Sequence, residues 1–248
     1  MERVTGTILN AAAIVAGGAI GLARKTPLSM AQQFFFKSAL GLLTIFFGLR
    51  LTWISFNGSL LQILKQLAIV LVALALGRLL GRLLQLQKMS NRLGQFARLK
   101  MMAAKPDSPR RSSDGFNVCA VLFCAAPLGI VGAVCDGLSA PGRTPEFYPL
   151  AIKAVMDGLA AMSFVGMFGA GVVLSAVPVL AFQGSITLVC ARALLPLLSA
   201  HGLVDSINAT AGLLIFCVAL IIFEIKRVEV TDYLPALVIA PLLTYWAG

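Results

Sequence analysis

The sequence predicts an all-α membrane protein, a polytopic bundle of about eight transmembrane helices. Of its 248 residues, 59% are hydrophobic and only 12% are charged, and the mean hydropathy is +0.92. A soluble domain is about 45–50% apolar and about 25% charged, because its surface must meet water. The composition therefore excludes a soluble globular enzyme, and the apolar content excludes a disordered chain.

Eight apolar segments follow one another along the chain, at 7–23, 37–56, 60–84, 116–136, 149–174, 178–200, 206–225 and 232–247. The first is preceded by both Glu2 and Arg3 instead of a basic start, so we expect a retained helix and not a signal peptide. Gly166, Gly169 and Gly171 predict a bend in the fifth segment, since each glycine weakens a helix by about 1 kcal/mol relative to alanine. The last segment is short and contains two prolines, which membrane helices tolerate.

The net charge of +10 favours a membrane topology over nucleic-acid binding, because the basic residues gather between apolar segments. The basic loops 24–37, 86–115 and 226–231 all fall on one side if there are eight crossings. The loops expected on the other side are poor in lysine and arginine. The positive-inside rule then places the three basic loops in the cytoplasm.

We expect a single integral membrane domain over residues 1–248, with 86–115 as a basic cytoplasmic linker. Apolar residues recur there at helical spacing, at Met89, Leu93, Phe96 and Leu99. This spacing among basic residues predicts an amphipathic helix at the inner interface, attracted to anionic lipids. A regulatory, calmodulin-like role is the alternative. The proline-containing run 105–114 predicts a flexible link.

Two short patterns suggest an internal repeat. Gly6–Asn10 opens the first segment and Gly115–Asn117 opens the fourth, while Lys37-x3-Gly41 and Lys153-x3-Asp157 lie in the second and fifth. With three crossings per unit, the second copy enters the membrane from the opposite face. This predicts an inverted 3+3 repeat of the kind common in transporters, followed by two C-terminal helices. Small-residue patterns such as Gly17-x3-Gly21 and Gly77-x3-Gly81 predict close helix packing.

Charged residues inside apolar segments are the strongest functional signal, since each costs roughly 2.5–3.5 kcal/mol at a helix centre. Asp136 ends the fourth segment, and Asp157 lies in the fifth with Lys153 one turn before it. Arg192, in the sixth segment, reaches a depth similar to that of Asp157. Two interpretations stay open: a charge-neutral pair of Asp157 with Lys153 or Arg192 that holds helices together, or a cation site built on Asp136 and Asp157.

The sixth segment begins with polar residues after Pro178, namely Gln183, Ser185 and Thr187. A break in the helix here would expose hard oxygen ligands for a cation. The alternative is an ordinary helix N-terminus capped by Ser185. Asn10 and other amides near segment starts are expected to bond between helices.

Catalytic and metal-binding patterns are missing from the sequence. The five cysteines form no CxxC pair, and the one histidine, His201, falls in a predicted outer loop. No phosphate-binding GxxxxGK[ST] loop and no nucleophile–histidine–acid set occur. We therefore expect no zinc site, no disulfide framework, no cofactor and no enzymatic activity.

Several stretches together resemble one protein family. They are Asp114-Gly-Phe, Phe123-Cys124, Ile130-Val-Gly132, Asp136-Gly-Leu138, Lys153 with Asp157-Gly158, Ser175-Ala-Val-Pro-Val-Leu180, Gln183-Gly-Ser-Ile-Thr-Leu188 and Leu234-Pro-Ala-Leu-Val-Ile-Ala-Pro-Leu242. In this order they are similar to the YdfK/YqgA-like family of bacterial inner-membrane proteins, across essentially the whole chain. That family is a domain of unknown function for which a sodium channel or pump has been suggested. The resemblance implies a multi-pass inner-membrane protein and favours ion transport.

The resulting hypothesis is movement of a small cation, Na⁺, through a channel or carrier. Asp157 and Asp136 would supply negative charge. Neutral oxygen ligands would come from Gln183, Ser185 and Thr187. Lys153 or Arg192 would pair with the acids and be released when a cation arrives. One alternative is a carrier for a small organic solute, lined by the Ala/Gly-rich segments. Another is a non-transporting membrane scaffold whose basic segment 88–111 binds lipid or a partner. Membrane lipids and a small cation are the expected partners, a homo-oligomer is compatible with the sequence, and nucleic acid is not expected.

Overall fold

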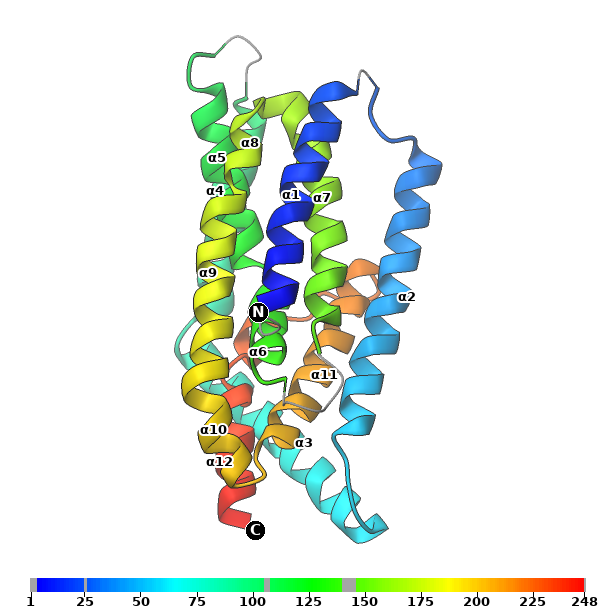
Figure 1. Cartoon of the computed structure of the whole chain (residues 1–248), viewed down its shortest axis with the longest axis vertical. Helices are drawn as coiled ribbons and strands as arrows, with labels where there is room; N and C mark the ends of the chain where they lie inside the picture. The colour runs from blue at the N-terminus through cyan, green and yellow to red at the C-terminus, as the bar shows by residue number, and fades with distance from the viewer. Residues whose placement is uncertain (1–3, 25, 105–107, 140–145, 248) are drawn as a thin grey trace.

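The structure is a computed structural model that describes residues 4–24, 26–104, 108–139 and 146–247, and every regular element within these ranges is helical. Seven helices or helix groups are long and apolar enough to cross a membrane, and one bent pair makes an eighth (Figure 1). The predicted polytopic helical bundle is therefore confirmed.

The main described helices are α1 (Thr5–Ala23), α2 (Met30–Ile54), α3 (Leu60–Leu83), α4 (Leu86–Met102), α5 (Arg111–Ala125), α6 (Pro127–Gly137), α7 (Tyr148–Phe168), α8 (Gly171–Leu174), α9 (Ala176–Val189), α10 (Leu195–Ala200), α11 (Val204–Ile222) and α12 (Ala236–Ala247). A π-helical turn, η2 (Cys190–Leu194), joins α9 to α10, and a 3-10 turn, η3 (Val230–Tyr233), precedes α12.

The α2 helix begins at Met30, well before the predicted start at 37, so the prediction that 24–37 is a loop is wrong over its second half. The reason is a capping box. The Gln32 backbone N–H donates to Ser29 Oγ (3.3 Å), and the Ser29 backbone N–H donates to Gln32 Oε1 (3.0 Å). This reciprocal pair satisfies two backbone groups that a helix end otherwise leaves open.

The fourth predicted segment is not one straight helix. It divides into α5 and α6, which are bent by 59° relative to each other. Ala126, at the junction, has the extended angles φ −65° and ψ 124° that a following proline favours, and Pro127 has no N–H to continue the helix. The bend turns α6 and its terminal Asp136 toward the start of α1.

The predicted bend at 166–171 is confirmed. The α7 helix ends at Phe168, and Gly169 follows with φ +71°, a left-handed conformation that glycine adopts without steric cost. Gly171 then packs so closely on α5 that a Cβ would collide with the carbonyl group of Ser112. The chain thus reverses within a few residues and enters α9.

The linker 86–115 contains the predicted amphipathic helix as α4, in which Ala97 is fully buried while Met89, Leu93, Phe96 and Leu99 are exposed. The predicted flexible link 105–114 is wrong at its C-terminal end, because α5 already begins at Arg111. The Arg111 guanidinium donates to the carbonyls of Gly166 (2.8 Å) and Met167 (2.9 Å), which holds this first turn against the end of α7. Residues 105–107 lie outside the described ranges.

Small residues allow three close helix pairs, of which those at Gly17 and Gly77 were predicted. On α1, a Cβ at Gly17 would collide with the Gly158 carbonyl of α7, and Gly21 faces Met162, so these helices run parallel. On α3, Gly77 and Gly81 lie against Ala236 and Asp232 of the antiparallel C-terminal segment. Gly48 of α2 faces Gly212 of α11 in the same way. A Cβ at Gly166 would have no such neighbour within 4 Å.

Ion pairs and hydrogen bonds show which turns share a side of the bundle. Lys37 of α2 pairs with Glu224 after α11 (2.6 Å), and Arg82 at the end of α3 pairs with Glu229 (3.1 Å). The opposite ends meet as well, since Asn57 after α2 donates to Asp205 of α11 (3.2 Å). In Figure 1 the turns after α1 and α4 lie at the upper end, and the C-terminus lies at the lower end. The helix directions therefore agree with an eight-crossing topology.

Candidate functional site

A buried polar cluster lies where α1, α7 and α9 meet. The side-chain amide of Asn10 donates to Asp157 Oδ2 (3.1 Å) and to Gln183 Oε1 (3.0 Å). Lys153 Nζ donates to the same Asp157 oxygen and forms an ion pair with it. Exposed fractions of 0% for Asn10 and Gln183, 2% for Lys153 and 7% for Asp157 place all four side chains in the protein interior.

The helical period explains why these side chains meet. Lys153 and Asp157 are four residues apart on α7, so they share one face and pair along it. Gln183 and Thr187 share a face of α9 in the same way, and both are fully buried. Gly129 of α6 leaves the required room, since a Cβ there would lie 2.6 Å from Lys153 Cε and 2.9 Å from Gln183 Nε2.

Two polar atoms of this cluster, Asn10 Oδ1 and Gln183 Nε2, are buried and find no hydrogen-bond partner in the part of the chain that the structure describes. Buried polar groups are nearly always bonded, and a group without a partner calls for an explanation such as water, an ion or a functional rearrangement. The cluster therefore combines one carboxylate, two amide oxygens and an ammonium group, with hydrogen-bonding capacity still open. Phe123 lies beside it, with its ring centre 5.9 Å from Lys153 Nζ.

A second polar layer lies one helical turn away. Thr7 of α1 and Thr187 of α9 bring their hydroxyl oxygens within 3.2 Å of each other. The Thr187 hydroxyl also donates to the carbonyl of Ala133 on α6 (3.2 Å). This layer joins α1 and α9, which supply Asn10 and Gln183, to α6.

Asp136 occupies a separate position at the start of α1. Its Oδ2 accepts the backbone N–H of Gly6 at 3.1 Å. A carboxylate at a helix N-terminus satisfies open N–H groups and complements the helix dipole. Within the described residues no hydrogen bond joins Asp136 to Lys153, Asp157 or Gln183, so the structure does not bring the two predicted acids into one direct contact.

The structure places two predicted site residues outside the buried polar cluster. Ser185 points away from Gln183 and Thr187, is exposed, and donates to the Ala181 carbonyl (2.7 Å). The predicted helix break at 183–187 is wrong, as is a capping role for Ser185, because α9 runs unbroken from Ala176 to Val189. Pro178 is tolerated in its first turn, where no helical N–H bond is lost. Arg192 is exposed on the π-helical turn, so Lys153 and not Arg192 is the partner of Asp157.

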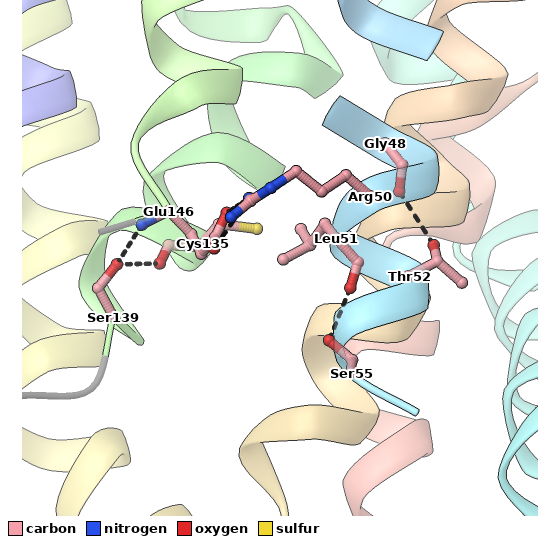
Figure 2. Close-up of polar contacts among 8 residues, drawn as sticks. All are labelled: Gly48, Arg50, Leu51, Thr52, Ser55, Cys135, Ser139 and Glu146. Atoms are coloured by element: carbon pink, nitrogen blue, oxygen red, sulfur yellow. Dashed lines mark hydrogen bonds and ion pairs between the residues drawn. The ribbon is translucent and has the colours of Figure 1, made fainter. Parts of the chain in front are cut away.

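A partly buried ion pair was not predicted from the sequence. Arg50 Nη1 of α2 donates to both carboxyl oxygens of Glu146, each at 3.2 Å, just before α7 (Figure 2). The Glu146 backbone N–H donates to Ser139 Oγ (2.9 Å), and Ser139 Oγ donates to the Cys135 carbonyl (3.1 Å). Arg50, the charge in the interior of the apolar segment 37–56 that begins with Lys37, was the signal that could have indicated this contact.

Aromatic rings reinforce the same junction. The ring of Tyr148, at the start of α7, stacks on Phe47 of α2 at 4.4 Å between ring centres. The Arg50 guanidinium lies over the same Tyr148 ring, 5.6 Å from its centre. Together with the Arg50–Glu146 pair, these contacts fasten α2 to the α6–α7 connection. Among the described residues, no three His, Cys, Asp or Glu side chains gather as a metal site would require.

Related proteins agree with the membrane-spanning helices of the structure. Residues 5–245 match the family described as "Protein of unknown function (DUF554)". The chain is 27% identical to "Uncharacterized membrane protein YdfK" of Bacillus subtilis (strain 168) over 241 residues, covering 97% of this chain and 95% of the relative. It is 29% identical to "Uncharacterized protein YqgA" of Escherichia coli (strain K12) over 247 residues, covering 99% and 98%. No solved structure matches the chain significantly. The chain is a membrane protein that belongs to the DUF554 family.

Proposed function

We propose that this protein is a membrane carrier for a small cation, Na⁺, with Asp157 as its charged ligand. The observation that carries the proposal is the buried Lys153–Asp157 pair, set beside the unpartnered oxygen of Asn10. An ionisable group inside a membrane protein is costly and usually marks a pathway for ions or protons. Hard oxygen ligands such as carboxylate and amide carbonyl groups suit an alkali cation.

In this mechanism Lys153 holds the position beside Asp157 when no cation is bound. An arriving Na⁺ takes over the carboxylate, and Asn10 Oδ1 and Gln183 Oε1 supply neutral oxygens. The displaced ammonium group stays near the face of the Phe123 ring, which attracts a cation. Because the buried polar cluster lies inside close helix packing, we favour a carrier that changes shape over an open channel.

We propose that the side carrying the basic turns faces the cytoplasm of a bacterial inner membrane, by the positive-inside rule. A membrane scaffold is the second candidate, and the observation in its favour is that Lys153 neutralises Asp157 in the protein interior. A scaffold does not transport ions, so a measurement of Na⁺ flux across the membrane distinguishes the two functions.

The test is ²²Na⁺ uptake into liposomes that contain the purified full-length protein. We expect uptake above that of protein-free liposomes, and loss of this uptake in Asp157→Asn, which keeps the shape of the side chain and removes its charge. Ser185→Ala is the matched control on α9, because Ser185 points away from the buried polar cluster, and it should transport like the wild type. Full uptake by Asp157→Asn, or no uptake by the wild type, would contradict the proposal and favour the scaffold.

A further inference from the structure

A separate cavity lies between α2, α3, α11 and α12, beside the turn that follows α2 and the turn that precedes α11. It has a volume of about 110 Å³ and is lined in part by Ser55, Gln66, Asp205, Ser206 and Thr244. None of its lining residues belongs to the buried polar cluster around Asp157. The volume is several times the roughly 30 Å³ that a water molecule takes up in the liquid, so a small ligand with part of its hydration fits.

Three hydroxyl groups around this cavity already donate their hydrogens to backbone carbonyls. Ser55 Oγ donates to the Leu51 carbonyl (2.7 Å), Ser206 Oγ to Leu203 (2.8 Å) and Thr244 Oγ1 to Ala240 (2.9 Å). A hydroxyl has one hydrogen and two lone pairs. These three side chains can therefore offer the cavity only oxygen lone pairs.

The amide groups nearby are tied to one another and hold the carboxylate in place. Gln66 and the backbone of Asn57 exchange two hydrogen bonds, each of 3.1 Å. The Asn57 side-chain amide donates to Asp205 Oδ2 at 3.2 Å. Among the described residues that line the cavity, Asp205 is the one carboxylate.

We propose that this cavity is a second cation site, which binds a hydrated monovalent cation such as Na⁺. One carboxylate matches one positive charge, whereas Ca²⁺ sites usually combine several carboxylates among six to eight oxygen ligands. Asp205 supplies the charge, and the hydroxyl oxygens of Ser55, Ser206 and Thr244 supply neutral ligands. The inference does not depend on transport at Asp157, because it concerns binding at a different group of helix ends.

The two tryptophans of the chain make this site observable. Trp53 and Trp246 stand close in sequence to Ser55 and Thr244, at the ends of α2 and α12. Purified full-length protein in detergent micelles is titrated with NaCl that replaces choline chloride at constant ionic strength. We expect a saturable change in tryptophan emission. In Asp205→Asn the apparent affinity for Na⁺ should fall on the order of tenfold or more, because ligand charge sets the affinity of such sites.

Three further variants test whether the Na⁺ response comes from this cavity. Ser206→Ala should weaken Na⁺ binding severalfold, and it decides the question if Asp205→Asn does not elute as a folded protein in size-exclusion chromatography. Ser163→Ala is the matched control, since its hydroxyl also donates to a carbonyl of its own helix (3.1 Å) but lies elsewhere. Asp157→Asn should keep a saturable Na⁺ response that Asp205→Asn weakens, which separates this site from the proposed carrier function. No saturable Na⁺ response in the wild type, or equal responses in wild type and Ser206→Ala, overturns the proposal.

Discussion

Asn10 of α1 reaches Asp157 of α7 at 3.1 Å, and the same amide nitrogen reaches Gln183 of α9 at 3.0 Å. One side-chain amide therefore joins three helices in the protein interior. Its two hydrogens account for both bonds, which fixes how the acceptors of α7 and α9 face each other. Asn10 is for this reason the residue on which the geometry of the buried polar cluster depends.

The first prediction concerns this amide. Asn10→Leu keeps the branched shape of the side chain but removes the donor to Gln183 Oε1 and one of the two donors to Asp157 Oδ2. We expect a loss of about 1–3 kcal/mol in the free energy of unfolding, measured in mixed detergent micelles. Asn117→Leu is the control, because Asn117 is exposed on α5 and should change this free energy little. Equal losses in both variants would contradict a bridging role for Asn10.

The second prediction separates a buried ion pair from two independent charges. Lys153→Met leaves the Asp157 carboxylate uncompensated in the interior and should lower the free energy of unfolding by about 3–5 kcal/mol. The double variant Lys153→Met, Asp157→Leu removes both charges and should recover most of this loss. Unfolding of all variants in the same micelles gives the comparison. Additive losses would show that the two side chains do not act as a pair.

The third prediction tests the close contact of α1 with α7. Gly17→Ala places a Cβ against the Gly158 carbonyl, so the helices must separate, and we expect a destabilisation of about 1–3 kcal/mol. Gly94→Ala is the matched control. Gly94 lies inside α4 with nothing within 4 Å of the added Cβ, so the better helix propensity of alanine should stabilise by up to about 1 kcal/mol. Thermal unfolding followed by circular dichroism distinguishes the opposite signs, and a neutral Gly17→Ala would refute the close packing.

The fourth prediction concerns the Arg50–Glu146 pair. A double-mutant cycle with Arg50→Met and Glu146→Gln should give a coupling energy of about 1–3 kcal/mol. This is smaller than the about 3–5 kcal/mol lost on breaking a fully buried pair, because Arg50 is 28% exposed. The more exposed Lys100–Asp114 pair is the comparison, and its coupling should stay below about 1 kcal/mol. A coupling no larger than that of Lys100–Asp114 would show that Arg50 and Glu146 do not fasten α2 to α7.

The fifth prediction is a pH dependence outside the membrane-spanning segments. The hydrogen bond and positive charge of Lys37 lower the pKa of Glu224 below its usual 4.5. A carboxylate with a lowered folded-state pKa contributes stability above its unfolded pKa, and this contribution is lost as the pH falls through the folded value. The stability difference between wild type and Glu224→Gln should therefore be small but constant near neutral pH, shrink as the pH falls below the usual pKa of 4.5, and vanish once the pH lies below the lowered pKa. An unchanged difference in acid would contradict the pairing with Lys37.

The predicted and observed helices and bends agree best where one local property of the sequence determines the backbone conformation. An apolar segment of about 20 residues has to be helical in a membrane, since every backbone group must find an internal partner. The bend at Gly169 and the close approaches of Gly17 and Gly77 also follow from local properties, because only glycine combines free dihedral angles with the absence of a side chain. The early start of α2 was readable as well, in the Ser29-x-x-Gln32 capping pattern.

By itself, the sequence determined that this protein is a membrane-spanning helical bundle, that its basic turns share one side, and that Lys153 and Asp157 lie on one helix face. Only the tertiary structure decided which helices supply their neighbours. It brought Asn10 and Gln183 to Asp157, turned Ser185 and Arg192 outward, moved Asp136 to the start of α1, and paired Arg50 with Glu146. The reason is that helical periodicity places side chains around one axis, whereas the partner across an interface depends on how distant segments pack.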